Sequence, residues 1–240
     1  MTVTLEWIGI IAIFLILAMI SYRAANVYFK VRISRELMEN TLSYSLSSDN
    51  YAKTMLVLGD STGVGVGAAR PEDSVAGRLA SYIAATYVEN YAISGAAVAD
   101  LPQQVKQAKL LRCDLILIQI GGNDILAFHN SQKTAQELGH IMNTLPQTAQ
   151  ILVMSAGNVG GATLFPSIIR PFHTGLNLHY HQAFGKVVPI HGGTYVNLYE
   201  PFWKDPFLRD PNRYLSRDGL HPSTYGYGLW FEKLRKHLKS

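Results

Sequence analysis

The stretch LVLGDSTGVGVGAAR, residues 56–70, joins an apolar run to an acid, a hydroxyl and three glycines at alternate positions. An apolar run that ends at a glycine is typical of a buried parallel strand. The residues after the run suit two kinds of chemistry. The glycines could let backbone N–H groups approach a phosphate, or Asp60 and Ser61 could place a hydroxyl at the end of the strand. Residues elsewhere in the chain distinguish the two.

Short apolar runs alternate with amphipathic segments from Thr54 onward. We expect strands at 54–59, 87–95, 114–124, 150–157 and 193–199. Helices are expected at 71–87, 101–112, 135–145 and 223–237, and residues 158–192 are expected to be less regular. Strands that alternate with helices at this spacing predict an α/β domain with a mainly parallel sheet and helices on both faces.

The N-terminus differs from the rest of the chain, because Trp7–Tyr22 is a run of sixteen residues without a charge. As a helix this run would span roughly 24 Å, close to the ~30 Å hydrocarbon core of a bilayer. A signal peptide usually has basic residues before its apolar run, but the only charge there is Glu6, and a clear small-x-small cleavage site is missing. We therefore expect a retained single-pass anchor rather than a cleaved signal peptide or a buried core helix.

Basic residues flank this anchor on one side only. Arg23, Lys30, Arg32 and Arg35 follow the span, and no Lys or Arg precedes it. The positive-inside rule then places the following chain on the cytoplasmic side of the inner membrane. We divide the chain into an anchor with its basic flank over 1–35, a polar, Ser-rich tether over 36–53, and a folded domain over 54–240.

Composition narrows the classes of partner. The net charge is +4 and no run of Lys and Arg resembles those of nucleic-acid-binding proteins, so we expect no nucleic-acid partner. The single cysteine, Cys113, gives no disulfide framework. His173, His179, His181 and His191 have neither a cysteine among them nor a pair four residues apart, so no metal site is predicted. The sequence sets no oligomeric state.

Polar groups follow three of the predicted strands. GDS ends at Ser61, SG ends at Gly95, and GGND occupies residues 121–124. The carboxyl ends of parallel strands are where such sheets gather their function. A fourth group, DGLHP at 218–222, precedes the last expected helix.

These groups match what the hydrolysis of an ester needs. A serine nucleophile requires a base within hydrogen-bond reach and a carboxylate that orients the base, and Ser61, His221 and Asp218 can supply them. Asp218 and His221 are three positions apart, a spacing at which a turn returns the carboxylate to the ring. The oxyanion of the tetrahedral intermediate needs preorganised donors. The N–H groups of Ser61 and Gly95 and the amide of Asn123 can offer such donors, and we expect Asp60 and Asp124 to be structural.

The four blocks resemble those of the SGNH hydrolases, also called the GDSL family. GDST is similar to the nucleophile block, and NYAISG at 90–95 to the block whose glycine N–H is an oxyanion donor. GGND resembles the block whose asparagine amide is the remaining donor, and DGLHP the block that completes the triad. The similarity runs from about Thr54 to the C-terminus. Thr62 departs from the leucine in the family's nickname, and Ala92 stands where many members have glycine or serine.

The resemblance implies a flavodoxin-like three-layer α/β/α sandwich and the hydrolysis of esters, thioesters or acetylated sugars without a cofactor. We expect a carboxylic ester hydrolase (EC 3.1.1.-) that forms an acyl-enzyme on Ser61. The segment 157–184 is expected to border the pocket, and its apolar and aromatic residues suit acyl chains better than sugars. With the anchor, this favours a lipid or lysophospholipid ester, and a thioesterase or a carbohydrate O-acetylesterase is the alternative on the same site.

Two alternatives from other classes account for fewer of these residues. Gly63, Gly65 and Ala68 fit the G-x-G-x-x-A fingerprint of a dinucleotide-binding Rossmann protein, with Glu89 about twenty residues on. That fingerprint normally begins where the strand ends, whereas residues 59–62 intervene here, and it gives no reason for GGND or DGLHP. A membrane-tethered interaction domain without catalysis would have no need of an intact Ser61, Asn123 and His221.

Overall fold

The computed structural model describes residues 5–49, 51–109 and 113–238. Within them, five parallel strands form one sheet in the order β2-β1-β3-β4-β5. The strands are β1 (Thr54–Gly59), β2 (Tyr87–Asn90), β3 (Leu115–Gln119), β4 (Gln150–Met154) and β5 (Thr194–Val196). All five lie where the apolar runs predicted them.

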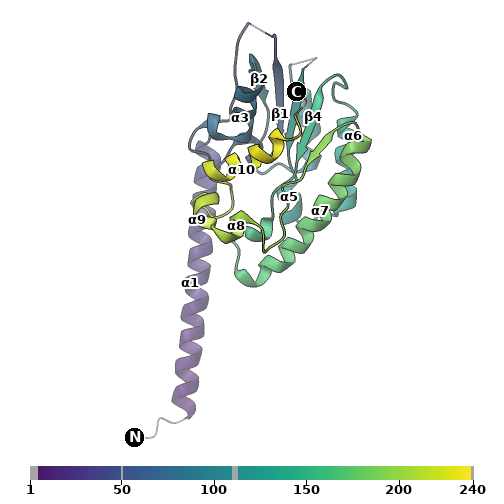
Figure 1. Ribbon diagram of the computed structural model, residues 1–240. Helices are drawn as coiled ribbons and strands as arrows, with labels where there is room; N and C mark the ends of the chain where they lie inside the picture. The colour runs from purple at the N-terminus through teal and green to yellow at the C-terminus, as the bar shows by residue number, and fades with distance from the viewer. Residues whose placement is uncertain (1–4, 50, 110–112, 239–240) are drawn as a thin grey trace.

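Helices cover both faces of the sheet (Figure 1). The helices of the domain, among the described residues, are α2 (Ser61–Val64), α3 (Val75–Tyr82), α4 (Leu101–Gln107), α5 (Gly122–Leu126), α6 (Ser131–Met142), α7 (Arg170–Ile190), α8 (Pro206–Arg209), α9 (Pro211–Tyr214) and α10 (Thr224–Arg235). The 3₁₀ turns are η1 (Pro71–Asp73), η2 (Val98–Asp100), η3 (Val159–Gly161) and η4 (Ser167–Ile169). Residues 110–112 of the expected helix over 101–112 lie outside the described residues.

The two apolar layers follow from the period of two in the strands. Leu56 and Leu58 of β1 face the layer formed with α4, α6 and α7. Met55 and Val57 face the opposite layer, formed with α3 and α10. The sheet is therefore buried on both faces, and the expected three-layer α/β/α sandwich is confirmed.

One long helix corrects the sequence interpretation. Residues 158–192 were expected to be less regular, but α7 takes up 21 of them. Its buried positions recur every three or four residues, as a helix requires, yet the first two are polar. The buried side chains are those of His173, Asn177, Tyr180, Phe184 and Val188. Because His and Asn stand on the buried face, apolar periodicity alone does not reveal this helix.

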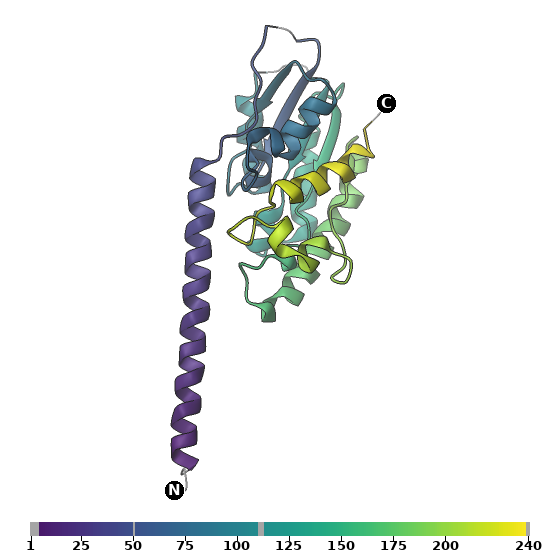
Figure 2. The same cartoon turned by 60° about the vertical axis from the view of Figure 1, so that its left-hand side comes forward.

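The N-terminal helix α1 (Leu5–Asn40) is continuous over 36 residues and projects far beyond the domain (Figures 1 and 2). Its apolar window has a mean hydropathy of 2.2 with none of it buried, so the helix is long and apolar enough to cross a membrane. By length and composition a signal sequence would also fit. The helix continues to Asn40, so residues 36–40 of the expected tether are helical, and Leu46 further along bridges to Val88 of β2.

Candidate active site

Ser61 lies at the carboxyl end of β1, in the first turn of α2. Asp60 precedes it as the N-cap, and one oxygen of the Asp60 carboxylate accepts hydrogen bonds from the backbone N–H and the hydroxyl of Thr62, both at 2.8 Å. The first N–H groups of a helix have no acceptor within that helix. Ser61 is the first residue of α2, so its N–H has no acceptor within the helix.

Asp218 and His221 lie together in the turn before α10. The turn is closed by a hydrogen bond of 2.8 Å from Ser216 N to His221 O, and Gly219 adopts a left-handed φ of 70° within it. Oδ1 of Asp218 accepts the N–H groups of Leu220 at 3.0 Å and His221 at 3.1 Å. This fixes the carboxylate at the position that the three-residue spacing predicted.

A continuous chain of hydrogen bonds joins the three side chains. Oδ2 of Asp218 lies 2.6 Å from His221 Nδ1, and His221 Nε2 lies 2.9 Å from Ser61 Oγ. Asp218 is fully buried and His221 is 5% exposed. Burial alone would raise the pKa of the Asp218 carboxyl, but the hydrogen bond and the charge of His221 outweigh it and hold that pKa below its ordinary value. Asp218 is therefore ionised at neutral pH and can stabilise an imidazolium.

The predicted oxyanion donors line the same pocket as Ser61 and His221, a cavity of about 250 Å³. Asn123 lies in α5, directly after β3, and its Nδ2 donates to Ala96 O at 2.8 Å. Gly95 has a φ of 88°, and a Cβ added there would meet no atom within 4 Å, so its backbone is open to the pocket. The structure thus brings together Ser61, Gly95, Asn123, Asp218 and His221.

Asp60 and Asp124, the other two acids beside the site, form contacts with neighbouring residues. Burial raises the pKa of Asp60 to about 6, although the bonds from Thr62 and the charge of His221 act against this. Asp124 accepts the Val98 N–H at 3.1 Å and contacts the His129 ring at 3.1 Å. Both arrangements match the structural roles predicted for these acids.

The glycine loop packs against the turn that carries His221. Gly67 has a φ of 94°, and a Cβ there would lie 3.3 Å from the Cβ of His221 and would collide with Pro222 O. Tyr227 of α10 donates its hydroxyl to Val66 O at 2.8 Å. The alternate glycines therefore allow close contact between two parts of the chain about 160 residues apart, which the triad requires.

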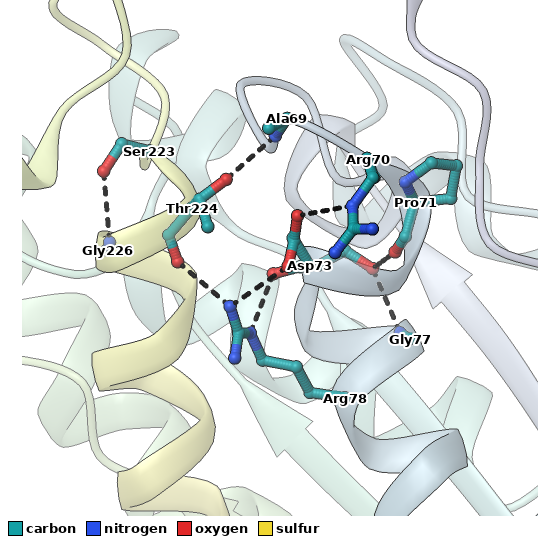
Figure 3. Close-up of polar contacts among 10 residues, drawn as sticks. Ala69, Arg70, Pro71, Asp73, Gly77, Arg78, Ser223, Thr224 and Gly226 are labelled. Carbon is teal, nitrogen blue, oxygen red and sulfur yellow. Dashed lines mark hydrogen bonds and ion pairs between the residues drawn. The ribbon is translucent and has the colours of Figure 1, made fainter.

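Figure 3 shows a second connection between these two parts. Ala69 N–H donates to the Thr224 hydroxyl at 2.9 Å, at the start of α10. Arg78 of α3 donates to Asp73 O at 2.9 Å and reaches Thr224 O at 3.4 Å. These bonds hold the start of α10, three residues after His221, against the segment that follows Ser61.

The space beside these glycines is thus filled by protein atoms rather than open to a dinucleotide. A Cβ on Gly63 would lie 2.8 Å from the Cβ of Ala92, and one on Gly65 would lie 2.7 Å from that of Ser74. The Glu89 carboxylate accepts bonds from the Tyr87 hydroxyl at 3.1 Å and from the Lys109 N–H at 2.9 Å. Across the ranges that the structure describes, no group of three or more His, Cys, Asp or Glu side chains could hold a metal ion.

The walls of the pocket come from more elements than the sequence indicated. The expected segment 157–184 contributes only its first part, through Gly157, Asn158, Val159, Gly161 and Ala162. Sequence reasoning missed several other lining residues, namely Ser34, Met38, Leu126, Ala156, Phe207, Leu215, Leu220 and Trp230. Leu220 stands within the DGLHP block, but no local motif marks the other positions, because they meet only when distant elements pack together.

Comparison with protein families agrees with this geometry. Residues 57–229 match the model of the GDSL-like Lipase/Acylhydrolase family. The chain belongs to this family. None of the curated proteins matches it.

Solved structures share the fold at low identity. A phospholipase A1 from Streptomyces albidoflavus NA297 is 18% identical with a TM-score of 0.60, and the match covers 78% of this chain and 100% of that one. An extracellular lipase from Streptomyces rimosus is 18% identical with a TM-score of 0.57, covering 78% and 100%. An acetyl xylan esterase from Geobacillus stearothermophilus is 16% identical with a TM-score of 0.55, covering 80% and 99%. At these identities the likeness establishes the fold and leaves the substrate open.

Proposed function

We propose that this GDSL hydrolase is a membrane-anchored carboxylic ester hydrolase that works through an acyl-enzyme on Ser61. The observation that carries the proposal is the Ser61–His221–Asp218 chain, with contacts of 2.9 and 2.6 Å, at the wall of a pocket that also contains the Asn123 amide. A serine beside a base that is itself oriented by a carboxylate is the arrangement that nucleophilic acyl transfer needs.

In the first half of the reaction, Ser61 Oγ attacks the acyl carbon and its proton passes to His221 Nε2. The oxyanion that forms on the acyl oxygen accepts hydrogen bonds from the N–H groups of Ser61 and Gly95 and from Asn123 Nδ2. The tetrahedral intermediate collapses when the bond to the leaving oxygen breaks and His221 donates the proton to that oxygen. An alcohol leaves and the acyl group stays on Ser61.

In the second half, His221 takes a proton from a water molecule as the water oxygen attacks the acyl-enzyme. Collapse of this intermediate returns the proton to Ser61 Oγ and releases a carboxylic acid. The ionised Asp218 stabilises the imidazolium in both halves and holds the imidazole with its Nδ1 proton on the side of the carboxylate.

The character of the pocket supports a lipid or other acyl ester. Much of its lining is apolar, including Leu126, Val159, Phe207, Leu220 and Trp230. The phospholipase A1 and the lipase among the structural neighbours share this fold, and so does the acetyl xylan esterase. A thioesterase or a carbohydrate O-acetylesterase would use the same triad, so the leaving group has to be tested directly.

The outer surface of the domain supports a substrate in the membrane. The N-terminal end of α7 lies at the end of the domain toward which the apolar half of α1 extends (Figure 2). Exposed apolar side chains occur at this end of α7 and in η4, where Ile168 is 86% exposed and Phe172 is 58% exposed. Exposed apolar residues beside a membrane span fit contact with the bilayer. We place the domain on the cytoplasmic side because the basic flank follows the span.

The first test is covalent labelling of the full chain in detergent with a fluorophosphonate, together with hydrolysis of p-nitrophenyl acetate. We expect both in the wild-type protein and neither after Ser61→Ala, while Ser131→Ala at the start of α6 keeps both. Wild-type protein that is neither labelled nor active, but binds NADH, would refute the hydrolase.

The second test compares p-nitrophenyl esters of increasing acyl length with a lysophospholipid, an acyl-CoA and acetylated xylan. Hydrolysis of the longer acyl esters and the lysophospholipid supports the lipid ester. Activity on acetylated xylan without activity on the other esters would assign the site to sugar acetates.

A further inference from the structure

The anchor helix α1 has two halves that differ in burial. Every described side chain from Trp7 to Asn26 is exposed, whereas many after it are covered by the domain. The covered positions recur at steps of three and four, as expected for one face of a helix. They include Val27, Lys30, Val31, Ser34, Leu37 and Met38.

Polar contacts fix this face to the domain. Lys30 Nζ donates to Thr163 O at 2.8 Å and to its hydroxyl at 3.0 Å. Glu36, an exposed residue beside this face, also forms an ion pair of 2.7 Å with Arg217, the residue before Asp218. Gly219, with its φ of 70°, leaves room for the Lys30–Thr163 contact, because a Cβ there would lie 3.1 Å from Lys30 Nζ. The helix therefore lies directly on the turn that carries Asp218 and His221.

Two side chains of the same face reach the active site. Ser34 and Met38, four residues apart, line the pocket of about 250 Å³ that contains Ser61 and His221. Ser34 is only 5% exposed, although the helix around it lies on the surface. One wall of the pocket is thus built by the helix that is long and apolar enough to cross a membrane.

We propose that α1 is part of the acyl-binding site, and that Met38, with Ser34, sets the length of acyl group that this site accepts. The inference rests on the proposed ester hydrolysis and extends it to substrate selection. Ser34 lies eleven residues after Arg23, or ~17 Å along the helix. The pocket is therefore close to the membrane surface, and an acyl chain that leaves the bilayer beside α1 meets Ser34 and Met38 as it approaches Ser61.

The test changes the size of Met38 in the full chain, in detergent micelles. Met38→Trp fills the pocket and Met38→Ala enlarges it, and Glu39→Trp and Glu39→Ala are the matched controls at the next, exposed position. The readout is the ratio of kcat/KM for p-nitrophenyl dodecanoate to that for p-nitrophenyl acetate. Thermal unfolding of each variant shows whether it is folded.

We expect Met38→Trp to lower this ratio about tenfold or more, since one methylene of misfit in an apolar pocket is worth roughly that factor. Met38→Ala should raise the ratio, and both Glu39 variants should stay within about twofold of wild type. Met38→Ala only removes atoms, so it decides the question if the Trp variant does not fold.

Failure of the two proposals would look different. If wild-type protein hydrolyses esters and both folded Met38 variants keep the wild-type ratio, the role of α1 is refuted and the hydrolase stands. If wild-type protein hydrolyses no ester and Ser61 takes no fluorophosphonate, the hydrolase is refuted, and the role of α1 falls with it.

Discussion

At the scale of single residues, the amide of Asn123 is held by one hydrogen bond and keeps a second donor. Nδ2 gives one N–H to Ala96 O at 2.8 Å, and a side-chain amide nitrogen has two. Among the residues that the structure describes, no acceptor is seen for the second N–H, so in the proposed mechanism it can serve the oxyanion without rearrangement of the side chain. A donor that is fixed in advance stabilises the transition state more than one that must be reoriented.

Replacing Asn123 with alanine should therefore lower kcat by ~10²–10³, the usual cost of losing one oxyanion donor. KM should change much less, because the bond strengthens as charge develops on the oxygen. Steady-state kinetics on p-nitrophenyl acetate measures both, with Asn212→Ala on the exposed side of α9 as the control. Unchanged turnover in Asn123→Ala would remove Asn123 from the mechanism.

The residues proposed to carry the chemistry are the ones whose positions the sequence predicts best. Ser61, Asn123 and the Asp218–His221 pair stand in short blocks, so their local spacing already constrains their geometry. The residues that shape the pocket behave differently. Met38 stands 23 positions before Ser61 in the chain, and its place beside the pocket depends on how α1 packs, which no local pattern encodes.

At the scale of elements, α4 holds the strand that carries the nucleophile. The Gln104 side chain of α4 is fully buried and binds Gly59 at the end of β1 twice, with its amide donating to Gly59 O and its oxygen accepting from Gly59 N, both at 2.8 Å. Gly59 O also accepts from Ile93 N at 3.0 Å. The Gly59 N–H depends on Gln104 for its acceptor.

Gln104→Met keeps the size of the side chain but leaves this buried N–H unpaired. We expect a loss of about 1–3 kcal/mol in the free energy of unfolding. For a chain of this length that loss lowers Tm by roughly 2–12 °C. Thermal unfolding measures it, and Gln103→Met on the exposed side of α4 should leave Tm nearly unchanged. Equal Tm values for the two variants would show that Gln104 does not hold β1.

Helices and strands were predicted well where their buried residues are apolar. The sheet is covered on both faces, so β1, β3 and β4 are mostly apolar, and all five strands were found where they were expected. The helix α7 was missed because polar His173 and Asn177 lie on its buried face. Asn177 accepts the Val159 N–H at 2.8 Å, next to the pocket. The polar residue that breaks the apolar pattern of α7 therefore helps to position the pocket wall.

At the scale of the whole molecule, α1 has two parts that differ in burial. Its first half is exposed on all sides, as a helix in lipid would be, and its second half packs on the domain beside the pocket. The sequence predicted the anchor from its apolar run, but it placed the end of the anchor at residue 35 and a tether after it. The covered face over Val27–Met38 instead ties the catalytic domain closely to the anchor.

Because the domain is tied closely to α1, labelling of a residue in the domain can show on which side of a membrane the domain lies. Asp100 is exposed in η2, and a cysteine there should react with a maleimide. The native Cys113 is buried, and burial, followed by the charges of Asp114 and Glu89, raises the pKa of its thiol to about 11. Because the thiolate is the reactive form, Cys113 should give little background.

We expect Asp100→Cys to resist a membrane-impermeant maleimide in intact spheroplasts and to react once the membrane is permeabilised. The physical reason is the cluster of Arg23, Lys30, Arg32 and Arg35, which follows the apolar run and favours the cytoplasmic side. Wild-type protein, with Cys113 alone, should stay unlabelled in both conditions. Labelling of Asp100→Cys in intact spheroplasts would place the pocket on the outer side of the membrane, and the lipids of that leaflet would then be the ones within reach of α1.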